Sequence, residues 1–186
     1  MESKRLNLAK DTKTIHLKKG GDIDVPQGES HYHLKQLANE EQSYVFHLRH
    51  ADSRVRITGL VDARLDQTPT LATTVIHHAP RTLAETLIRT LSQDQAFPHY
   101  SGLIRMEHGA EQCESYLNHH ALLLGEEAQS WTLPSLEILA NEVKCSHAAT
   151  VRTITDDDLF YARSRGITAT EARTLLIEAF LHDVQN

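Results

Sequence analysis

The hydrophobic period changes once along this chain, and the change restricts the folds open to it. Short segments in which apolar and polar residues alternate recur across residues 43–150, as in half-buried strands. After Thr150 the period becomes 3.6, the repeat of an amphipathic helix. The expected strands are Tyr44–His50, Arg54–Thr58, Leu71–His78, Leu103–His108, Ser135–Leu139 and Val143–His147. The sequence therefore predicts a mainly β body followed by a C-terminal α-helical hairpin.

Short strands at such spacing suit a β-sandwich, a β-barrel or a β-solenoid, and sequence repeats are too weak to choose among the three. One segment also fits two local structures. Thr82 and Glu85 have the spacing of a helix capping box, and four apolar residues could line one helical face. These apolar residues are Leu83, Leu87, Ile88 and Leu91. Strand and helix both remain open for residues 82–91.

Capping signals mark two C-terminal helices. Thr155 precedes three aspartates, which places an N-cap hydroxyl and carboxylates at the positive end of a helix dipole. Gly166 is expected to end this helix, and Thr168 with Glu171 forms the capping box of the next one. The second helix carries an apolar stripe of Ala172, Leu175, Leu176, Ala179 and Phe180. Core packing is the expected role of this stripe, and a partner interface is the alternative.

Length and charge set the domain organisation. A chain of 186 residues fits one compact domain. We divide it into a basic N-terminal arm (1–28), a β core (29–152) and a C-terminal helical region (153–186). The net charge is −6, but residues 1–19 carry +4 (six Lys and Arg against two acidic residues), so the remainder carries −10. Nucleic-acid binding is disfavoured, because it needs a clustered basic surface.

Cysteine usage and hydropathy indicate the cellular compartment. The chain contains two cysteines and no leader-like N-terminus, which favours a reducing cytoplasm over export. The longest purely aliphatic run is Ala121–Leu124, far below the roughly 18 residues that a membrane span needs. We therefore expect a cytoplasmic protein that binds neither a membrane nor nucleic acid.

Cys145 and His147 are the side chains best placed for chemistry. They are two residues apart in a strand-like run, so they point to one face about 6 to 7 Å apart. This thiol and imidazole could bind a soft metal if neighbouring strands supplied further ligands. The alternative is a buried cysteine that acts as a small hydrophobe beside a hydrogen-bonded histidine. A Cys-His hydrolase is a third hypothesis, but the sequence shows no orienting group or oxyanion loop for this pair.

The remaining cysteine and the thirteen histidines give no second metal motif. Cys113 lacks the two-residue spacing to another cysteine that marks zinc sites. His119 and His120 are adjacent, so in a strand they point to opposite faces. His31 and His33 would share a face if their segment is extended. For each of these histidines, a solvated or hydrogen-bonded core side chain is the expected role.

Several segments of the second half follow one another in the order found in the SufB/SufD family, the subunits of the SUF machinery of iron-sulfur cluster assembly. They are Leu122–Glu126, Leu133–Ile138, Val143–Thr150, Leu159–Ile167 and the helix that ends in Ala179-Phe180. The string K-C-S-H at residues 144–147 is similar to SufD rather than to SufB. The chain thus resembles this family over roughly residues 50–181, as a short form that covers the C-terminal half of its longer members.

The resemblance implies both a fold and a function. The implied fold is a right-handed parallel β-helix followed by a helical domain, with a strand rather than a helix at residues 86–91. The implied function is that of a non-enzymatic scaffold component on which clusters are built. Family members pair through the β-helix, and their C-terminal helices dock on the ABC-type ATPase SufC. The implied partners are a SufC-like ATPase and either a SufB-like subunit or a second copy of this chain in a homodimer.

Positions of the family carry over to particular residues. His147 matches the SufD histidine implicated near the scaffold interface, and Cys145 matches the cysteine two residues before it. Alignment on Leu123–Glu126 puts His119, and not Cys113, at the scaffold-cysteine position of SufB. His147, Cys145 and His119 are therefore the implied metal or cluster residues. The implied cofactor is iron or an iron-sulfur cluster, held transiently and shared with a partner.

The same resemblance assigns a docking surface and an oligomeric state. Phe160, Tyr161, Arg163 and Arg165 lie in the region that resembles the ATPase-docking helices. A shortened β-helix leaves unpaired backbone groups at an open end, so we expect at least a dimer. The alternative function is a stand-alone homo-oligomeric metal-binding or interaction module derived from this family.

Overall fold

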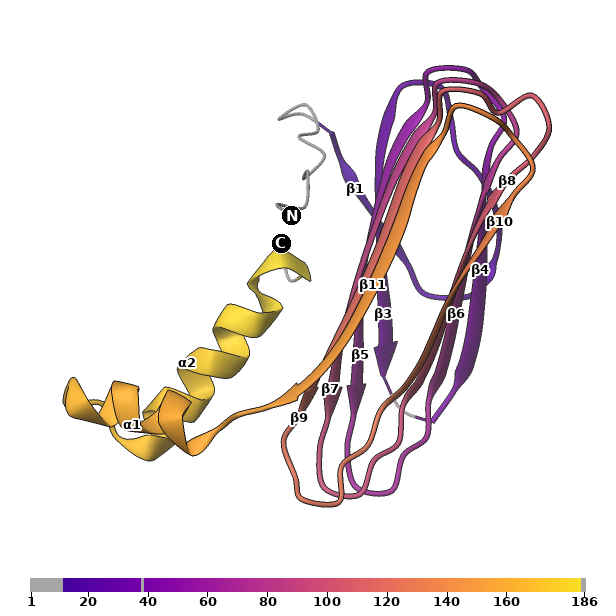
Figure 1. The fold of residues 1–186 in the computed structure, drawn as a ribbon. Coiled ribbons are helices and arrows are strands. Elements are labelled where there is room, and N and C mark those ends of the chain that lie inside the picture. Colours follow the sequence, from indigo (N-terminus) through magenta and orange to yellow (C-terminus); the bar gives the residue numbers. More distant parts are fainter. Residues whose placement is uncertain (1–11, 38, 185–186) are drawn as a thin grey trace.

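The computed structural model describes residues 12–37 and 39–184, whose strands wind into a parallel β-helix with helices on one side (Figure 1). The strands are β1 (Thr14–Leu17), β2 (Gly21–Asp24), β3 (Glu29–Leu37), β4 (Glu41–Leu48), β5 (Arg54–Ala63), β6 (Thr70–His77), β7 (Leu83–Ser92), β8 (His99–Met106), β9 (Glu114–Leu123), β10 (Trp131–Ile138) and β11 (Lys144–Thr153). The helices are α1 (Asp156–Ser164), α2 (Ala169–Leu181) and the 3-10 turn η1 (His182–Val184). The expected fold class is confirmed.

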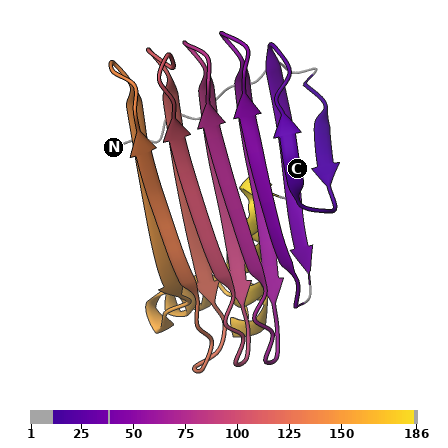
Figure 2. The same ribbon diagram turned by 90° about the vertical axis from the view of Figure 1, so that its right-hand side faces the viewer.

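Consecutive strands pass alternately between two sheets. Within the described residues, the odd-numbered strands form a six-stranded sheet in the order β1-β3-β5-β7-β9-β11. The even-numbered strands form a five-stranded sheet in the order β10-β8-β6-β4-β2, and they lie side by side in Figure 2. Each strand pairs in parallel with the strand two places away in the chain. This connectivity selects the solenoid and excludes the sandwich and the barrel.

The core lies between the two sheets and is filled by alternate residues of each strand. Tyr44, Phe46 and Leu48 of β4 are fully buried in it, as are Val55 and Ile57 of β5. The residues between them on β4 point outward and are exposed or half-buried. The six strands expected from the alternation are present as β4, β5, β6, β8, β10 and β11. The period-two interpretation is confirmed.

Residues 82–91, for which two structures were open, contain a strand. β7 pairs with β5 along one edge and with β9 along the other. Both of its faces are covered, because Ala84 and Ile88 lie in the core and Leu87 and Leu91 pack beneath the C-terminal helix. A strand buried on both faces loses its polar alternation, so its apolar spacing also suited a helix. The helix alternative is wrong, and the strand implied by the family resemblance is confirmed.

The repeat of the β-helix appears in its backbone dihedral angles. Asp52, Arg81, Gln112 and Glu142 have φ angles of 64, 57, 58 and 54°. Each lies two residues before a strand of the six-stranded sheet, and neighbouring members are about 30 residues apart. The Arg81 guanidinium donates two hydrogen bonds of 2.8 Å to the Asp52 carboxylate, which joins corners of successive turns.

The first turn of the β-helix lies inside the segment predicted as a basic arm. β1 pairs with β3 and β2 pairs with β4, and Leu17 and Ile23 pack against the core. From Thr14 onward, this part of residues 1–28 therefore belongs to the sheets, and the arm boundary at residue 28 is wrong. The two strands have only four residues each, which is too short to show a period. Residues 1–11 of the arm lie outside the described residues.

The helical hairpin begins and ends at the predicted residues. The Thr155 hydroxyl accepts a hydrogen bond from the Asp158 N–H, and the Thr168 hydroxyl accepts one from the Glu171 N–H. Gly166, with a φ of 85°, follows the end of α1. The predicted N-cap at Thr155 and the predicted capping box of Thr168 and Glu171 are thus confirmed. The described helices are too short or too polar to span a membrane.

α2 and η1 pack on the outer face of the six-stranded sheet by their C-terminal end (Figure 1). Their contact is an apolar cluster of Phe180, Leu181 and Val184 with Leu60, Leu87, Leu91 and Leu122. Arg89 adds polar contacts, since its guanidinium lies 4.8 Å from the Phe180 ring centre and 3.3 Å from the Asp183 carboxylate. The predicted stripe is only partly buried: Ala172 is covered, whereas Leu175 is 51% exposed. Core packing therefore explains one part of the stripe and leaves the other part at the surface.

Candidate functional site

The β-helix ends with two open strand edges. In the described part of the chain, β10 pairs only with β8 and β11 pairs only with β9. The Lys144 N–H donates to the Cys113 carbonyl oxygen at 2.9 Å. Even-numbered residues of β11 therefore bond toward β9, and odd-numbered residues direct their backbone groups to the open edge. Such an edge is a template on which another strand can pair.

Side chains of the core type are exposed at this end. Ile138 is 44% exposed and Val151 is 47% exposed. Their register partners on the preceding turn, Met106 and Ala121, are fully buried. The difference arises because no further turn covers the last one in the described residues. Exposed apolar side chains that lie together are typical of contact sites for other molecules.

Cys145 and His147 lie on this last turn. They pair with Ser115 and Leu117 of β9, and Leu117 points into the core, so both side chains occupy the inward face of β11. Cys145 is half-buried, and burial raises the pKa of its thiol to about 11, which keeps it protonated at neutral pH. His147 is exposed. The shared face predicted for this pair is confirmed, and its role as a ligand pair stays a prediction.

His119 lies one turn deeper on the same inward face. Its register partner on β11 is Ala149, and its side chain is fully buried. Its Nε2 is 2.9 Å from the Thr90 hydroxyl, and its ring centre is 4.6 Å from that of Tyr100. Burial, with smaller contributions from His120 and Arg89, lowers the pKa of His119 to about 3. It is therefore a neutral interior imidazole at physiological pH.

Cys113 is also an interior side chain. Its sulfur lies 3.0 Å from the Thr82 hydroxyl and 3.2 Å from the Ala79 carbonyl oxygen. The same hydroxyl is 2.6 Å from Nδ1 of His77, which is fully buried. Hydrogen bonds thus occupy this thiol within a corner of the β-helix. Among the described residues, no three or more His, Cys, Asp and Glu side chains converge as a metal site.

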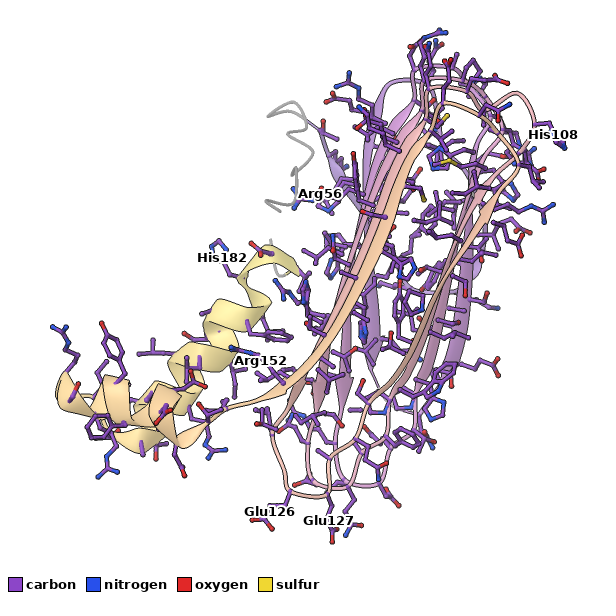
Figure 3. All side chains as sticks on the ribbon, in the orientation of Figure 1. Arg56, His108, Glu126, Glu127, Arg152 and His182 are labelled. Carbon is purple, nitrogen blue, oxygen red and sulfur yellow. The ribbon has the colours of Figure 1, made fainter. Side chains whose placement is uncertain are left out.

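Of the residues predicted for ATPase docking, three lie on α1 and Arg165 is its C-cap residue; the helix has no buried residue. Phe160 is 74% exposed and Tyr161 is 66% exposed. The Arg165 guanidinium lies 5.5 Å from the Tyr161 ring centre, and Arg163 is exposed in the last turn of the helix. In Figure 3 the chain runs from Arg152, near the end of β11, to α1, which lies away from the sheets. All four residues are therefore accessible, and Arg165 and Tyr161 are in contact with each other.

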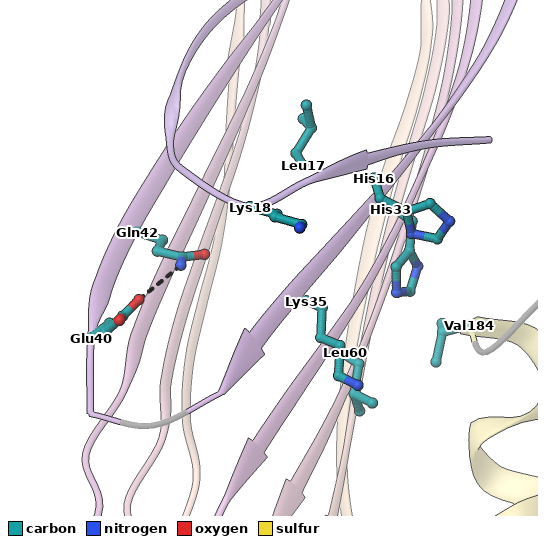
Figure 4. Close-up of a pocket in the computed structure, with 9 residues that line it drawn as sticks. All are labelled: His16, Leu17, Lys18, His33, Lys35, Glu40, Gln42, Leu60 and Val184. Carbon is teal, nitrogen blue, oxygen red and sulfur yellow. Dashed lines mark hydrogen bonds between the residues drawn. The ribbon is translucent and has the colours of Figure 1, made fainter.

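One cavity was not predicted from the sequence. It has a volume of about 570 Å³ and lies at the opposite, N-terminal end of the β-helix (Figure 4). It is lined by His16, Leu17, Lys18, His33, Lys35, Glu40, Gln42, Leu60 and Val184. The one signal in the sequence was the shared face of His31 and His33, which is confirmed: both rings contact the Thr58 hydroxyl at 3.0 Å.

Comparison with known proteins supplies the family. The family model described as "SUF system FeS cluster assembly, SufBD core domain" matches residues 3–180. The chain belongs to the SufBD core domain family. The resemblance to SufB and SufD that the C-terminal segments carry is thereby confirmed.

Curated SufBD relatives match parts of the chain. The iron-sulfur cluster assembly protein SufD of Escherichia coli is 40% identical over 94 residues, which cover 50% of this chain and 22% of that protein. SufD of Bacillus subtilis is 32% identical over 127 residues, which cover 68% of this chain and 29% of that protein. A SufBD family protein of Synechocystis is 33% identical over 115 residues, which cover 62% of this chain and 25% of that protein. The matched segments span less than a third of these relatives.

The buried neutral state of His119 predicts a pH-dependent stability. Its folded pKa of about 3 lies below the ordinary 6.5, so unfolding takes up a proton between these values. The stability that His119 contributes to the folded state is fully present above pH 6.5. It is lost as the pH falls below this value, by up to about 1.4 kcal/mol per pH unit. The free energy of unfolding can be measured in urea at about pH 7 and at about pH 5.5. Between these two values it should fall more in wild type than in His119→Gln.

The exposed His108 supplies the control for this measurement (Figure 3). His108→Ala should keep the wild-type dependence on pH. Equal slopes in wild type and His119→Gln would contradict the buried neutral state.

Proposed function

We propose that this chain is a non-enzymatic, SufD-like scaffold component of iron-sulfur cluster assembly. It binds an ABC-type ATPase and either a SufB-like subunit or a second copy of itself. The open last turn carries this proposal: among the described residues, β10 and β11 have unpaired outer edges and exposed side chains of the core type, in a chain of the SufBD core domain family. A β-helix that stops in this way gains stability when another chain covers it.

Pairing at the last turn supplies two interactions to its open end, namely backbone hydrogen bonds and apolar burial. The odd-numbered residues of β11 offer backbone groups to a strand of the partner. Ile138, Leu139 and Val151, which are 44–47% exposed, are covered by the same contact. Strand addition with apolar burial is a recurrent mode of association between sheets. The partner therefore continues the β-helix rather than binding at its side.

Iron or an iron-sulfur cluster is the cargo of this interface in our proposal. Cys145 and His147 offer a thiol and an imidazole at the open edge, and both are ligand types that iron accepts in cluster proteins. Because no third donor converges with them in the described residues, the partner supplies the remaining ligands. The Cys145 proton leaves when the thiol coordinates the metal, which lowers its pKa.

The α1 surface is the proposed docking site for the ATPase. Exposed aromatic rings and arginines are the side chains that contribute most energy at protein interfaces. The contact of Arg165 with Tyr161 restrains both side chains before binding. The C-terminal end of α2 holds the hairpin on the six-stranded sheet, so a load on α1 is transmitted to the β-helix.

Pairing is tested by adding charge to the open end. Ile138→Lys should weaken association by about tenfold or more, because an ammonium group would be buried against apolar surface. Light scattering after gel filtration, alone and with a SufB-like subunit, measures the mass. Leu65→Lys, at a corner residue that is 68% exposed, is the matched control and should keep wild-type association.

A second variant tests the backbone edge. Ala149→Pro removes an outward N–H without breaking the ladder to β9, and it should also favour the monomer. A wild-type chain that is monomeric both alone and in the presence of a SufB-like subunit would refute the pairing proposal.

The cargo is tested by anaerobic reconstitution of the paired complex with iron and sulfide. His147→Ala and Cys145→Ser should each lower the bound iron and sulfide and the visible absorbance, because each removes one donor. His108→Ala, at an exposed corner of the preceding turn, should retain the wild-type content. Zinc or copper bound without sulfide, and independent of His147, would instead favour a metal-binding module.

Docking is tested by calorimetric titration of the SufC-like ATPase. The double variant Phe160→Ala/Tyr161→Ala should weaken binding by about tenfold or more through loss of two exposed aromatic anchors. Trp131→Ala, an aromatic that is 42% exposed on β10, is the control and should leave ATPase binding unchanged. Unchanged affinity in the double variant would show that another surface docks the ATPase.

A further inference from the structure

Two imidazoles meet on the outer face of the five-stranded sheet, which faces away from the helices (Figure 1). His47 lies on β4, and His78 directly follows β6, the neighbouring strand. Nδ1 of His47 is 3.0 Å from Nε2 of His78, and the two ring planes differ by 21°. The pair is separated from the open last turn by β8, so it is not part of the site already described.

The backbone of both residues is held by the sheet. The His78 N–H donates to the Leu48 carbonyl oxygen at 3.0 Å, and the His47 carbonyl oxygen accepts from the Val25 N–H at 2.9 Å. The flanking side chains Phe46 and Leu48 are buried in the core, which fixes His47 outward. Ligands on rigid, hydrogen-bonded strands lose little freedom on binding. The pair is therefore positioned before any ligand arrives.

A carboxylate lies on the far side of the first ring. Asp22 Oδ1 is 3.6 Å from Nε2 of His47. A proton on Nε2 is favoured by this carboxylate, which leaves the lone pair of Nδ1 directed toward His78. A metal-binding histidine commonly has such a carboxylate at its second nitrogen. The Asp22–His47 contact is electrostatic, being longer than a hydrogen bond, and it favours the tautomer that leaves Nδ1 available to a metal.

The surroundings of the second ring favour its neutral form. Burial lowers the pKa of His78, and Arg49 and His47 lower it further, while Glu107 and Asp24 oppose them. Arg49 is itself paired with Asp24 at 2.7 Å, which reduces its repulsion toward a cation. Neutral imidazole is the form that ligates metals.

We propose that His47 and His78 form a two-nitrogen site for a divalent transition metal that prefers imidazole, such as Cu²⁺, Zn²⁺ or Ni²⁺. Two nitrogens at about 2.0–2.1 Å from one ion are about 3 Å apart when they subtend roughly a right angle, which matches the observed spacing. On binding, the rings tilt so that both lone pairs point to the ion. The proton that His78 Nε2 donates to His47 moves to His78 Nδ1. Water fills the other positions, because no third donor converges in the described residues.

The test uses Cu²⁺ alone as the probe, on tag-free protein, with calorimetry and electron paramagnetic resonance. Wild type should bind one more tight equivalent than either His47→Ala or His78→Ala, with a spectrum that shows two coupled nitrogens. Asp22→Asn should weaken this site by about tenfold, because it removes the carboxylate at the second nitrogen. His108→Ala and His147→Ala should keep the extra equivalent, which separates this site from the proposed cluster edge.

The competing outcome is a plain hydrogen bond between the rings. Equal copper stoichiometry in wild type and His78→Ala, or a spectrum unchanged by both histidine variants, would overturn the proposal. Both side chains point outward, so the variants should retain the wild-type circular dichroism. A variant that fails to fold is replaced by His78→Gln, which keeps hydrogen bonding but lacks the ligating ring nitrogen.

Discussion

The parallel hydrogen-bond ladder is the interaction on which the rest of this structure depends. Each turn of the β-helix satisfies the backbone groups and covers the inward side chains of the turn before it. Met106 and Ile138 occupy matched positions on β8 and β10, yet one is fully buried and the other is 44% exposed. The place where the ladder stops is therefore the place where the molecule can take a partner. Position in the ladder, and not residue type, separates core from interface here.

One strand connects the two surfaces that we assign to partners. β11 carries Cys145 and His147 near its start, and the chain passes from its last residue, Thr153, almost directly into α1. Ten residues of extended chain span roughly 33 Å, so the proposed cluster residues and the proposed docking helix lie at opposite ends of one strand. Phe180, packed beside Arg89, fixes the hairpin to the sheet and limits its freedom to swing. A displacement of the helices would therefore also displace the open edge of β11.

Alternation and capping residues allowed most strands and both helices to be predicted from the sequence, but the solenoid itself was not fixed by them. Its repeat lies in the left-handed conformations of Asp52, Arg81, Gln112 and Glu142, which have no single side-chain type in common. β7 matched a helix as well as a strand because both of its faces are covered, a fact that depends on α2. The family resemblance resolved both points. The His47–His78 contact joins two strands across 31 residues of sequence, and no local pattern marks it.

Burial and metal binding act against each other at Cys145. Its half-buried thiol is protonated at neutral pH, so it is a poor ligand until a metal cation displaces the proton. A partner that covers the last turn removes water from the edge and strengthens the attraction between cation and thiolate. As we propose it, the same partner also supplies the donors that do not converge with Cys145 in the described residues. In the proposed function, pairing and cluster binding are therefore coupled. His119 differs from Cys145 because it lies one turn deeper, where its own chain already covers it. Its buried ring is neutral and belongs to the core.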